Sequence, residues 1–269
     1  MNRALSDLHV AVLMGGISAE RQVSLSSGEE CAKALERQGA RVSRVDAGRD
    51  LANVLSGLIK PDVALNCLHG AWGEDGCVQG VLETLRIPYT HSGVLASALA
   101  MDKDKSKAVL KAAGLQVPGG GLFDRHEVAN RHVIEPPYVV KPNAEGSSVG
   151  VYLVREGASD FASEVAATDW SYGEKVMVEP FIPGKELAVT VLGETAGPRA
   201  LTVTDITPVK GFYDYEAKYA KGGSVHVLPA VLPPHVFEAA LREAELAHTA
   251  MGCRGVSRSD FRYDDVKDD

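Results

Sequence analysis

Apolar runs and helical spacing alternate through the first part of the chain. Three runs, HVAVLMGG, RVSRVD and DVALNCL, predict strands, and IPYT predicts a further short one. Between and after them, SLSSGEECAKALERQG, LANVLSGLI and VQGVLETLR carry apolar residues at helical spacing. Strands that alternate with helices predict a parallel sheet with helices on both faces and ligands at the carboxyl ends of its strands. The Gly-rich turns GGISAERQ and HGAWGEDG directly follow two of these strands.

The first predicted helix carries signals for its face and its ends. Ser26 and Glu29 fit a capping box, and Gly39 fits a C-terminal stop. One face of the helix gathers the residues Leu25, Gly28, Cys31, Ala32 and Leu35. That face is predicted to pack against the sheet.

The pattern changes at Met101. MDKDKSKAVLKAAG predicts a basic helix that Gly114 closes, and five strand-like runs follow: PPYVVKP, VGVYLV, EKVMVEPFI, KELAVTVLG and ALTVTDITP. One helix near residues 161–168 interrupts them, and a long helix near Pro234–Met251 comes later. This order predicts an α+β region with an antiparallel sheet.

The last strand-like run, GVSRSDFRY, leads into the acidic segment DDVKDD. Such a turn normally leads into a hairpin partner, and without one the strand is an exposed edge that favours aggregation. We therefore expect the natural protein to continue beyond Asp269.

Composition narrows the class of protein. The 269 residues are 45% hydrophobic and 24% charged, with a formal net charge of −8, which disfavours a general nucleic-acid-binding surface. The four cysteines form no CxxC pair and no zinc spacing, so we interpret them as small buried hydrophobes in a reduced compartment. The N-terminus has no leader pattern, and no apolar run approaches the roughly 20 residues of a membrane span. A cytoplasmic protein without membrane or nucleic-acid partners is predicted.

The segment KPNAEGSSVG, which begins at Lys141, joins two predicted strands. Its small residues would let backbone N–H groups approach phosphate oxygens, and Lys141 would add charge. The plainer alternative is a hairpin loop with a solvated lysine. The segment is not a Walker loop, because the sequence contains neither GxxxxGK[ST] nor GxGxxG.

Seven motifs occur in the order GGISAERQVSLSSG, LHGAWGEDG, ALAMDKDKSK, VKPNAEGSSVG, VEPFIPGKELAV, FYDYEAKY and SRSD. Together, from about Val10 to Asp260, the chain resembles the D-alanine–D-alanine ligases of the ATP-grasp family. The resemblance implies an α/β N-terminal substrate domain over residues 1–101. It also implies two α+β ATP-grasp lobes, a central one over 102–186 and a C-terminal one over 187–269 that is incomplete. A homodimer is expected.

The resemblance implies an ATP site. It assigns the phosphates to Lys103 and Lys141, and the transferring phosphoryl group to Lys218. The flap over the phosphates, the adenine-binding backbone and the ribose acceptor would comprise Glu145, Ser147, Ser148, Glu179, Pro180, Phe181, Ile182 and Glu186. Pro180 stands where many relatives have lysine, and proline offers no N–H donor.

Local sequence alone supports plainer interpretations of some of these residues. Lys103 fits the solvated face of a basic helix, and we keep that interpretation for Lys105 and Lys107. Glu186 fits a surface carboxylate on a strand equally well.

The resemblance also implies a substrate site. Glu20 would bind the ammonium of the first D-alanine, with His69 near its carboxylate. Ser147 and Tyr219 would join Glu20 in a hydrogen-bonded link that closes the loop around GFYDYEAKYAKGGS, which we expect to be mobile without ligands.

Arg258 and Asp260 alternate on the last predicted strand and so share one face, where an ion pair is the simplest arrangement. In the family the arginine stabilises the tetrahedral intermediate and the aspartate binds Mg²⁺ or Mn²⁺. The Glu-x-Asn motif that supplies the family's other metal ligands is absent from this sequence.

The implied activity is the ATP-dependent, ADP-forming joining of two D-alanines, through an acyl phosphate, for peptidoglycan synthesis. Two alternatives stay open. One is an ATP-grasp ligase that makes D-alanyl-D-lactate, which the tyrosine of EAKY disfavours. The other is a nucleotide-binding chain without catalysis, because the Glu-x-Asn motif is missing. On that ground we expect residues 1–269 alone to lack D-alanine-dependent ADP release.

Overall fold

The computed structural model describes residues 3–158, 162–209 and 222–268. The chain divides into two compact units, Met1–Met101 with Cys253–Gly255, and Asp102–Gly252 with Val256–Asp269. Helices among the described residues are too short or too polar to span a membrane.

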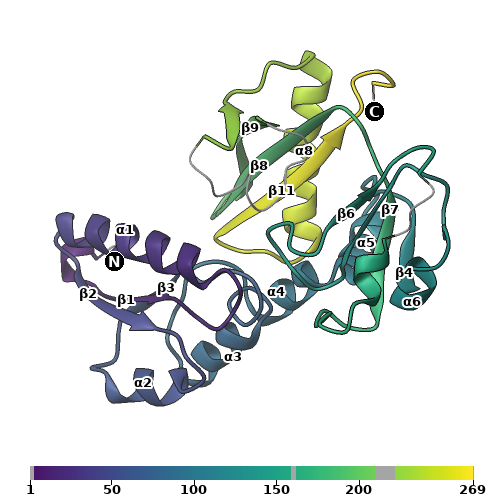
Figure 1. Cartoon of the computed structure of the whole chain (residues 1–269). Coiled ribbons are helices and arrows are strands. Elements are labelled where there is room, and N and C mark those ends of the chain that lie inside the picture. Colours follow the sequence, from purple (N-terminus) through teal and green to yellow (C-terminus); the bar gives the residue numbers. More distant parts are fainter. Residues whose placement is uncertain (1–2, 159–161, 210–221, 269) are drawn as a thin grey trace. The chain divides into compact units, whose positions relative to one another are not determined.

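The first unit is built on a parallel sheet, as predicted (Figure 1). β1 (His9–Met14) lies between β2 (Arg41–Asp46) and β3 (Val63–Asn66). All six residues of β1 are buried, because helices cover both faces of this central strand. The predicted strand IPYT contributes only a single bridge, from Tyr89 to Ala64.

Alternate residues of β1 face opposite layers of helices. Val10, Val12 and Met14 pack with α1 (Arg21–Arg37), and Ala11 and Leu13 pack with the helices of the other face. The remaining elements of this unit are the 3₁₀ turn η1 (Leu5–Asp7) and the helices α2 (Leu51–Gly57), α3 (Cys77–Thr84) and α4 (Val94–Met101). The period of two along a strand thus separates two apolar clusters.

Three expectations about helices need correction. α1 begins at Arg21, not near Ser26, so the proposed capping box lies inside the helix. The Glu20 carbonyl already accepts from the Ser24 N–H at 3.0 Å, which starts the helix one turn earlier. α4 was not predicted, and the predicted basic helix begins only after Asp102, whose side chain accepts from the Lys105 N–H at 3.0 Å.

The cysteines are free thiols that differ in burial. Cys67 is buried, and this burial, with Cys31 nearby, raises the pKa of its thiol to about 12. Cys77 is exposed at the start of α3, so the expectation of a buried residue is wrong there.

The described part of the second unit contains two antiparallel four-stranded sheets, which confirms the predicted α+β class. The first has the order β4-β7-β5-β6, and Val128, Tyr138, Val165 and their buried neighbours form its hydrophobic core. Its elements are β4 (Gly121–Asp124), α6 (Arg125–Val128), β5 (Tyr138–Pro142), β6 (Tyr152–Val154) and β7 (Lys175–Pro180). The helix expected near residues 161–168 is only the 3₁₀ turn η2 (Ser163–Ala166) in the described residues.

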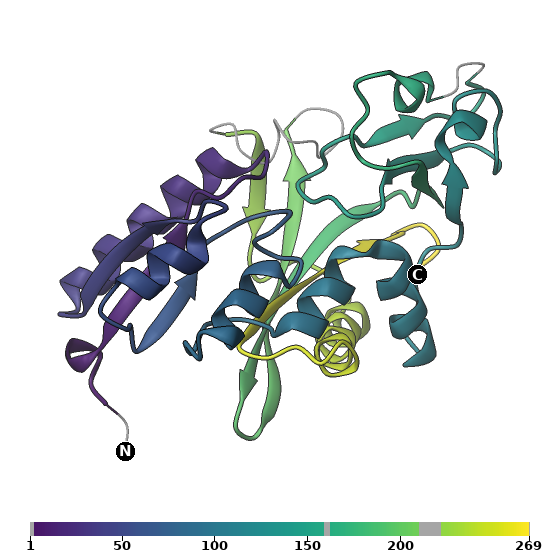
Figure 2. The same cartoon turned by 90° about the horizontal axis from the view of Figure 1, so that it is seen from below.

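The second sheet has the order β10-β9-β8-β11, with β11 at an edge in the part of the chain that is described. α8 (Pro234–Ala250) packs on one face over Leu187, Val189 and Val203 (Figure 2). The strands are β8 (Lys185–Glu194), β9 (Gly197–Pro208), β10 (Ser224–Val227) and β11 (Val256–Tyr263). Because β8 and β11 pair in antiparallel register, Glu186 lies opposite Arg262 and Ala188 opposite Asp260, on the face away from α8.

Candidate functional site

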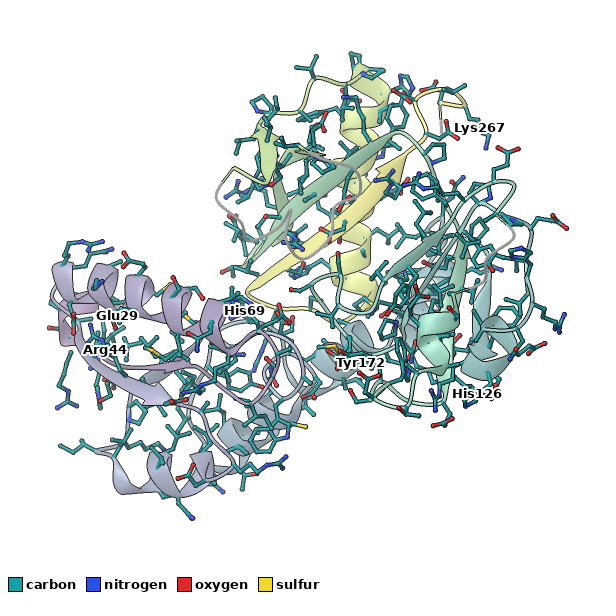
Figure 3. All side chains as sticks on the ribbon, in the orientation of Figure 1. Glu29, Arg44, His69, His126, Tyr172 and Lys267 are labelled. Atoms are coloured by element: carbon teal, nitrogen blue, oxygen red, sulfur yellow. The ribbon has the colours of Figure 1, made fainter. Side chains whose placement is uncertain are left out.

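Two loops at the carboxyl ends of β1 and β3 bring Glu20 and His69 together in the first unit. The Ser18 hydroxyl donates to the His69 carbonyl at 2.7 Å and accepts from the Glu20 N–H at 3.2 Å. A Cβ atom on Gly70 would meet the Glu20 carboxylate at 2.6 Å, so glycine there allows the buried carboxylate to approach the turn. The His69 Nε2 lies 3.3 Å from the Ser27 hydroxyl of α1. Figure 3 labels His69, near one end of this helix.

The turn that follows His69 is held by side chains of its own motif. Glu74 accepts from the Gly70 N–H at 2.6 Å, and Asp75 accepts from the Trp72 N–H at 2.7 Å. The Asn66 amide bridges the turn, because it donates to the Gly73 carbonyl and accepts from the Leu68 N–H. Fixed backbone on both sides of His69 holds this loop in one conformation, and its predicted role in substrate binding stays a prediction.

A buried carboxylate organises two lysines in the second unit. Glu179, with 8% of its side chain exposed, is the residue before the last in β7 and forms ion pairs with Lys141 of β5 and with Lys107. Lys107 lies 2.7 Å from Glu179 and also donates to the Gly119 carbonyl at 2.9 Å. Burial alone would raise the pKa of the Glu179 carboxyl, but Lys141 and Lys107 outweigh it and hold that pKa below its ordinary value.

Lys103 lies where α5 (Lys103–Ala112) meets the loop after β5. Its ammonium donates to the Asn143 carbonyl at 3.3 Å and to the Glu145 carbonyl. Burial, and after it the positive charge of Lys141, lower the pKa of Lys103 to about 8. The ammonium groups of Lys107 and Lys141 therefore contact the Glu179 carboxylate, and Glu179 also acts electrostatically on Lys103, as do Glu145 and Asp102. These lysines supply local positive charge that suits a polyanion in a chain that is acidic overall.

The depressed pKa of Lys103 predicts a pH-dependent affinity for ATP. As the pH rises from 7 to 9, the free protein loses the Lys103 proton, whereas bound phosphates would retain it. Affinity should therefore fall about tenfold over this range, with proton uptake on binding near pH 8. Calorimetry in two buffers of different ionisation enthalpy measures that uptake. Lys103→Met should abolish it, and uptake that persists in this variant would contradict the assignment.

The loop after Lys141 is fixed at its start. The Asn143 side chain donates to Asp102 at 2.9 Å and accepts from the Asp104 N–H at 3.0 Å, which ties the loop to the start of α5. Ser147 and Ser148 have positive φ angles of 51° and 59°, a conformation that residues with side chains disfavour. The role of this loop as a flap over phosphates stays a prediction.

The predicted nucleotide-base segment, Glu179 to Ile182, crosses from one sheet to the other. Pro180 has no N–H, and the Phe181 N–H donates to the Pro137 carbonyl at 3.0 Å. The Ile182 carbonyl accepts from Arg262 at 2.8 Å. Glu186, the predicted ribose acceptor, is half-buried and lies 3.4 Å from the same guanidinium.

Arg258 and Asp260 form the ion pair that the sequence suggests. Two hydrogen bonds of 2.9 and 3.0 Å join the guanidinium to both carboxylate oxygens. Within the described ranges, no three His, Cys, Asp or Glu side chains come together as a metal site would require. Asp260 is half exposed, so its carboxylate can still contribute to an ion that phosphate oxygens also hold.

Two residues of the second unit were misjudged or missed. Lys107 is no solvated surface lysine, because it pairs with Glu179 with 17% of its side chain exposed. Its spacing of four residues from Lys103 puts both on one helical face, which is the signal that was available. Arg262 was missed. It continues the alternation of Arg258 and Asp260, so the same period of two places it on their face of the strand. Lys105 is exposed, as expected.

Some predicted contacts stay predictions. Lys218, Tyr219 and most of the loop around them lie outside the described residues. Glu20 belongs to the first unit and Ser147 to the second, so their predicted link also remains a prediction.

Comparison with protein families and curated proteins identifies the chain's relatives. Family models described as the D-ala D-ala ligase N-terminus and C-terminus match residues 43–92 and 109–268. The chain is 69% identical to D-alanine–D-alanine ligase of Caulobacter vibrioides, over 98% of this chain and 81% of that protein. It is 61% identical to the enzyme of the same name from a Chelativorans species, over 96% and 82%.

Solved structures agree with the sequence comparisons. VanG D-Ala:D-Ser ligase from Enterococcus faecalis has a TM-score of 0.78 at 29% identity, covering 97% of this chain and 88% of that one. D-alanine–D-alanine ligase from Bacillus anthracis, complexed with ATP, has a TM-score of 0.76 at 27% identity, covering 96% and 82%. With its parallel N-terminal sheet, its two antiparallel sheets and relatives at these identities, the chain belongs to the D-alanine–D-alanine ligase family of ATP-grasp proteins.

Proposed function

We propose that this protein joins two D-alanines into D-alanyl-D-alanine with cleavage of ATP to ADP and phosphate, in peptidoglycan synthesis. The observation that carries the proposal is the cluster of Lys103, Lys107 and Lys141 around buried Glu179, in a chain of this family. Such a cluster binds a polyphosphate through charge that the protein has already arranged before the ligand arrives.

Chemistry begins at the carboxylate of the first D-alanine. A carboxylate oxygen attacks the γ-phosphorus of ATP, the bond to the β-phosphate oxygen breaks, and ADP leaves. Lys103 and Lys141 stabilise the negative charge that spreads over the phosphate oxygens, and Lys218 is assigned to the transferring group. The resulting acyl phosphate is a better electrophile than the carboxylate.

The second step forms the peptide bond. The neutral amine of the second D-alanine attacks the acyl carbon, phosphate leaves with its bonding electrons, and the nitrogen gives up one proton, which the departing phosphate can accept. Glu20 holds the ammonium of the first substrate, His69 lies near its carboxylate, and Arg258 stabilises the tetrahedral intermediate. Ser147, Tyr219 and the flap exclude water from the acyl phosphate.

The nucleotide is held along the second unit. The segment from Glu179 to Ile182 binds adenine, and Glu186 accepts the ribose hydroxyls. Glu145, Ser147 and Ser148 cover the phosphates.

Asp260 is the residue that would hold Mg²⁺ or Mn²⁺. One carboxylate together with nucleotide phosphates is a usual environment for Mg²⁺, so this side chain fits such an ion. The ion would neutralise phosphate charge when bound.

The experiment is an assay of ADP release with D-alanine, coupled to product identification by mass spectrometry. A chain that carries the family's Glu-x-Asn motif is expected to give D-alanine-dependent ADP and D-alanyl-D-alanine, with no reaction from L-alanine. Residues 1–269 alone, which lack that motif, are expected to release no D-alanine-dependent ADP. Adding D-lactate or D-serine with D-alanine tests the rival ligases. ATP binding in calorimetry without D-alanine-dependent ADP release by the chain with the motif would instead support a nucleotide-binding protein without catalysis.

A further inference from the structure

Arg262 contacts three parts of the nucleotide-binding region at once. Its Nε and Nη2 atoms donate to the Ile182 carbonyl at 3.1 and 2.8 Å, and Nη2 also lies 3.3 Å from the Gly184 carbonyl. Its Nη1 lies 3.4 Å from the Glu186 carboxylate. The guanidinium carbon lies 5.6 Å from the centre of the Phe181 ring.

The segment that these contacts hold is the connection between the two sheets of the second unit. It joins the end of β7, where the adenine is proposed to bind, to the start of β8, where Glu186 lies. Gly184 has a φ of +87°, and a Cβ atom there would meet the Tyr263 carbonyl at 2.1 Å. The connection therefore packs directly against the backbone of β11. The side chain of Arg262, which also belongs to β11, donates hydrogen bonds to the carbonyls of this connection.

The chemistry of arginine suits this task. A guanidinium is planar, always charged and carries five donors, so one side chain can bond carbonyls on one edge and a carboxylate on another while its face lies on an aromatic ring. Lysine would place a single ammonium at one of these partners. With 30% of its side chain exposed, Arg262 is shielded enough for its bonds to orient their partners rather than exchange with water.

We propose that Arg262 is a positioning residue for the nucleotide. It fixes the Phe181–Gly184 connection, and it orients Glu186 toward the ribose. This inference rests on the proposed ATP site and adds a residue to it. Arg262 acts through its contacts with Glu186 and with the connection. By orienting Glu186, it sets the preference of the nucleotide site for a ribose over a deoxyribose.

The test is calorimetric binding of ATP and of 2′-deoxy-ATP to the full chain, without D-alanine. In Arg262→Met, affinity for ATP should fall about tenfold and affinity for 2′-deoxy-ATP about threefold, since only ATP loses the oriented hydroxyl contact. The preference for ATP should therefore shrink about threefold. Arg262→Lys should restore little of it, because the fork geometry is lost.

A matched control lies in the same sheet. Arg199 of β9 also pairs with a glutamate, Glu194, at 2.6 Å, but at the exposed β8–β9 hairpin. Arg199→Met should leave both affinities unchanged. Thermal unfolding confirms that each variant is folded at the temperature of the titration.

The outcomes separate this inference from the proposed function. An unchanged ATP preference in Arg262→Met overturns the inference, whether both affinities stay the same or both fall equally through a general loss of structure. Because binding is measured without turnover, the inference is decided even when no D-alanine-dependent ADP is found. Conversely, dipeptide formation by a chain that carries the Glu-x-Asn motif upholds the proposed function even when Arg262→Met leaves the preference for ATP unchanged.

Discussion

Replacing Glu179 with glutamine is expected to lower the free energy of unfolding by about 3 kcal/mol, because breaking a buried ion pair leaves its partners uncompensated. Glu179 is the carboxylate between Lys107 and Lys141, and its charge also acts on Lys103. Glutamine keeps nearly the same shape and can still accept a hydrogen bond, so the loss reports charge rather than packing. Urea unfolding, monitored by circular dichroism, measures it.

The same variant should respond more strongly to anions than the unaltered chain does. Without Glu179, three lysines repel one another, and a polyphosphate becomes the available counter-charge. ATP or pyrophosphate at saturating concentration should therefore raise the unfolding temperature of Glu179→Gln by more than that of the unaltered chain.

Glu174→Gln is the control for this experiment. Glu174 pairs with Arg125, but 75% of its side chain is exposed, so its loss should cost less than about 1 kcal/mol. Equal destabilisation by the two variants would contradict the central role given to Glu179.

Replacing Lys141 with methionine is expected to weaken ATP binding by about 1.5–3 kcal/mol, or roughly 10- to 150-fold, the range for a hydrogen bond to a charged group. Two effects act in the same direction. The variant loses an ammonium that would contact phosphate, and it leaves Glu179 with less positive charge to offset its repulsion of the nucleotide. Methionine keeps the unbranched stem, so packing against β7 is largely retained.

Lys105→Met supplies the comparison. This lysine lies on α5, two residues from both Lys103 and Lys107, but 63% of its side chain is exposed. Calorimetry should find its ATP affinity within about twofold of the unaltered chain, as for an exposed surface charge. Equal losses in both variants would indicate that general positive charge, and not the site around Glu179, attracts the nucleotide.

The salt dependence of ATP affinity distinguishes Lys141 from Lys105 further. Exposed charges are screened within about 10 Å at 0.1 M salt, whereas partly buried ones are screened much less. The difference in affinity between the unaltered chain and Lys141→Met should therefore persist as salt is raised.

Local pattern determined most of the secondary structure. The buried run HVAVLMGG became β1, and α8 covers nearly the whole predicted range Pro234–Met251. Strand–helix alternation predicted the parallel sheet, because its short connections leave few other arrangements. Period two correctly placed Arg258 and Asp260 on one face, since alternation along a strand is a local property of the backbone.

Helix boundaries and weak elements depended on tertiary context. α1 extends one turn before Ser26, and Ser24 there donates to the carbonyl of Cys67, which is distant in sequence. The short β4 and β10 exist because a neighbouring strand pairs with them. Local periodicity predicts neither the start of α1 nor these two strands, because secondary-structure propensity is a weak guide where long-range hydrogen bonds compete with it.

The motifs pointed to Lys103, Lys141 and Glu179, but only the tertiary structure decided how they work together. Lys107 is 72 residues from Glu179 along the chain, and the pairing of β5 with β7 brings Lys141 to the same carboxylate. Arg262 reaches the connection at Ile182 across 80 residues, through the register of β8 with β11. Sequence pattern fixes which face of an element a side chain occupies, whereas sheet register and burial decide which distant charges meet there and how strongly they interact.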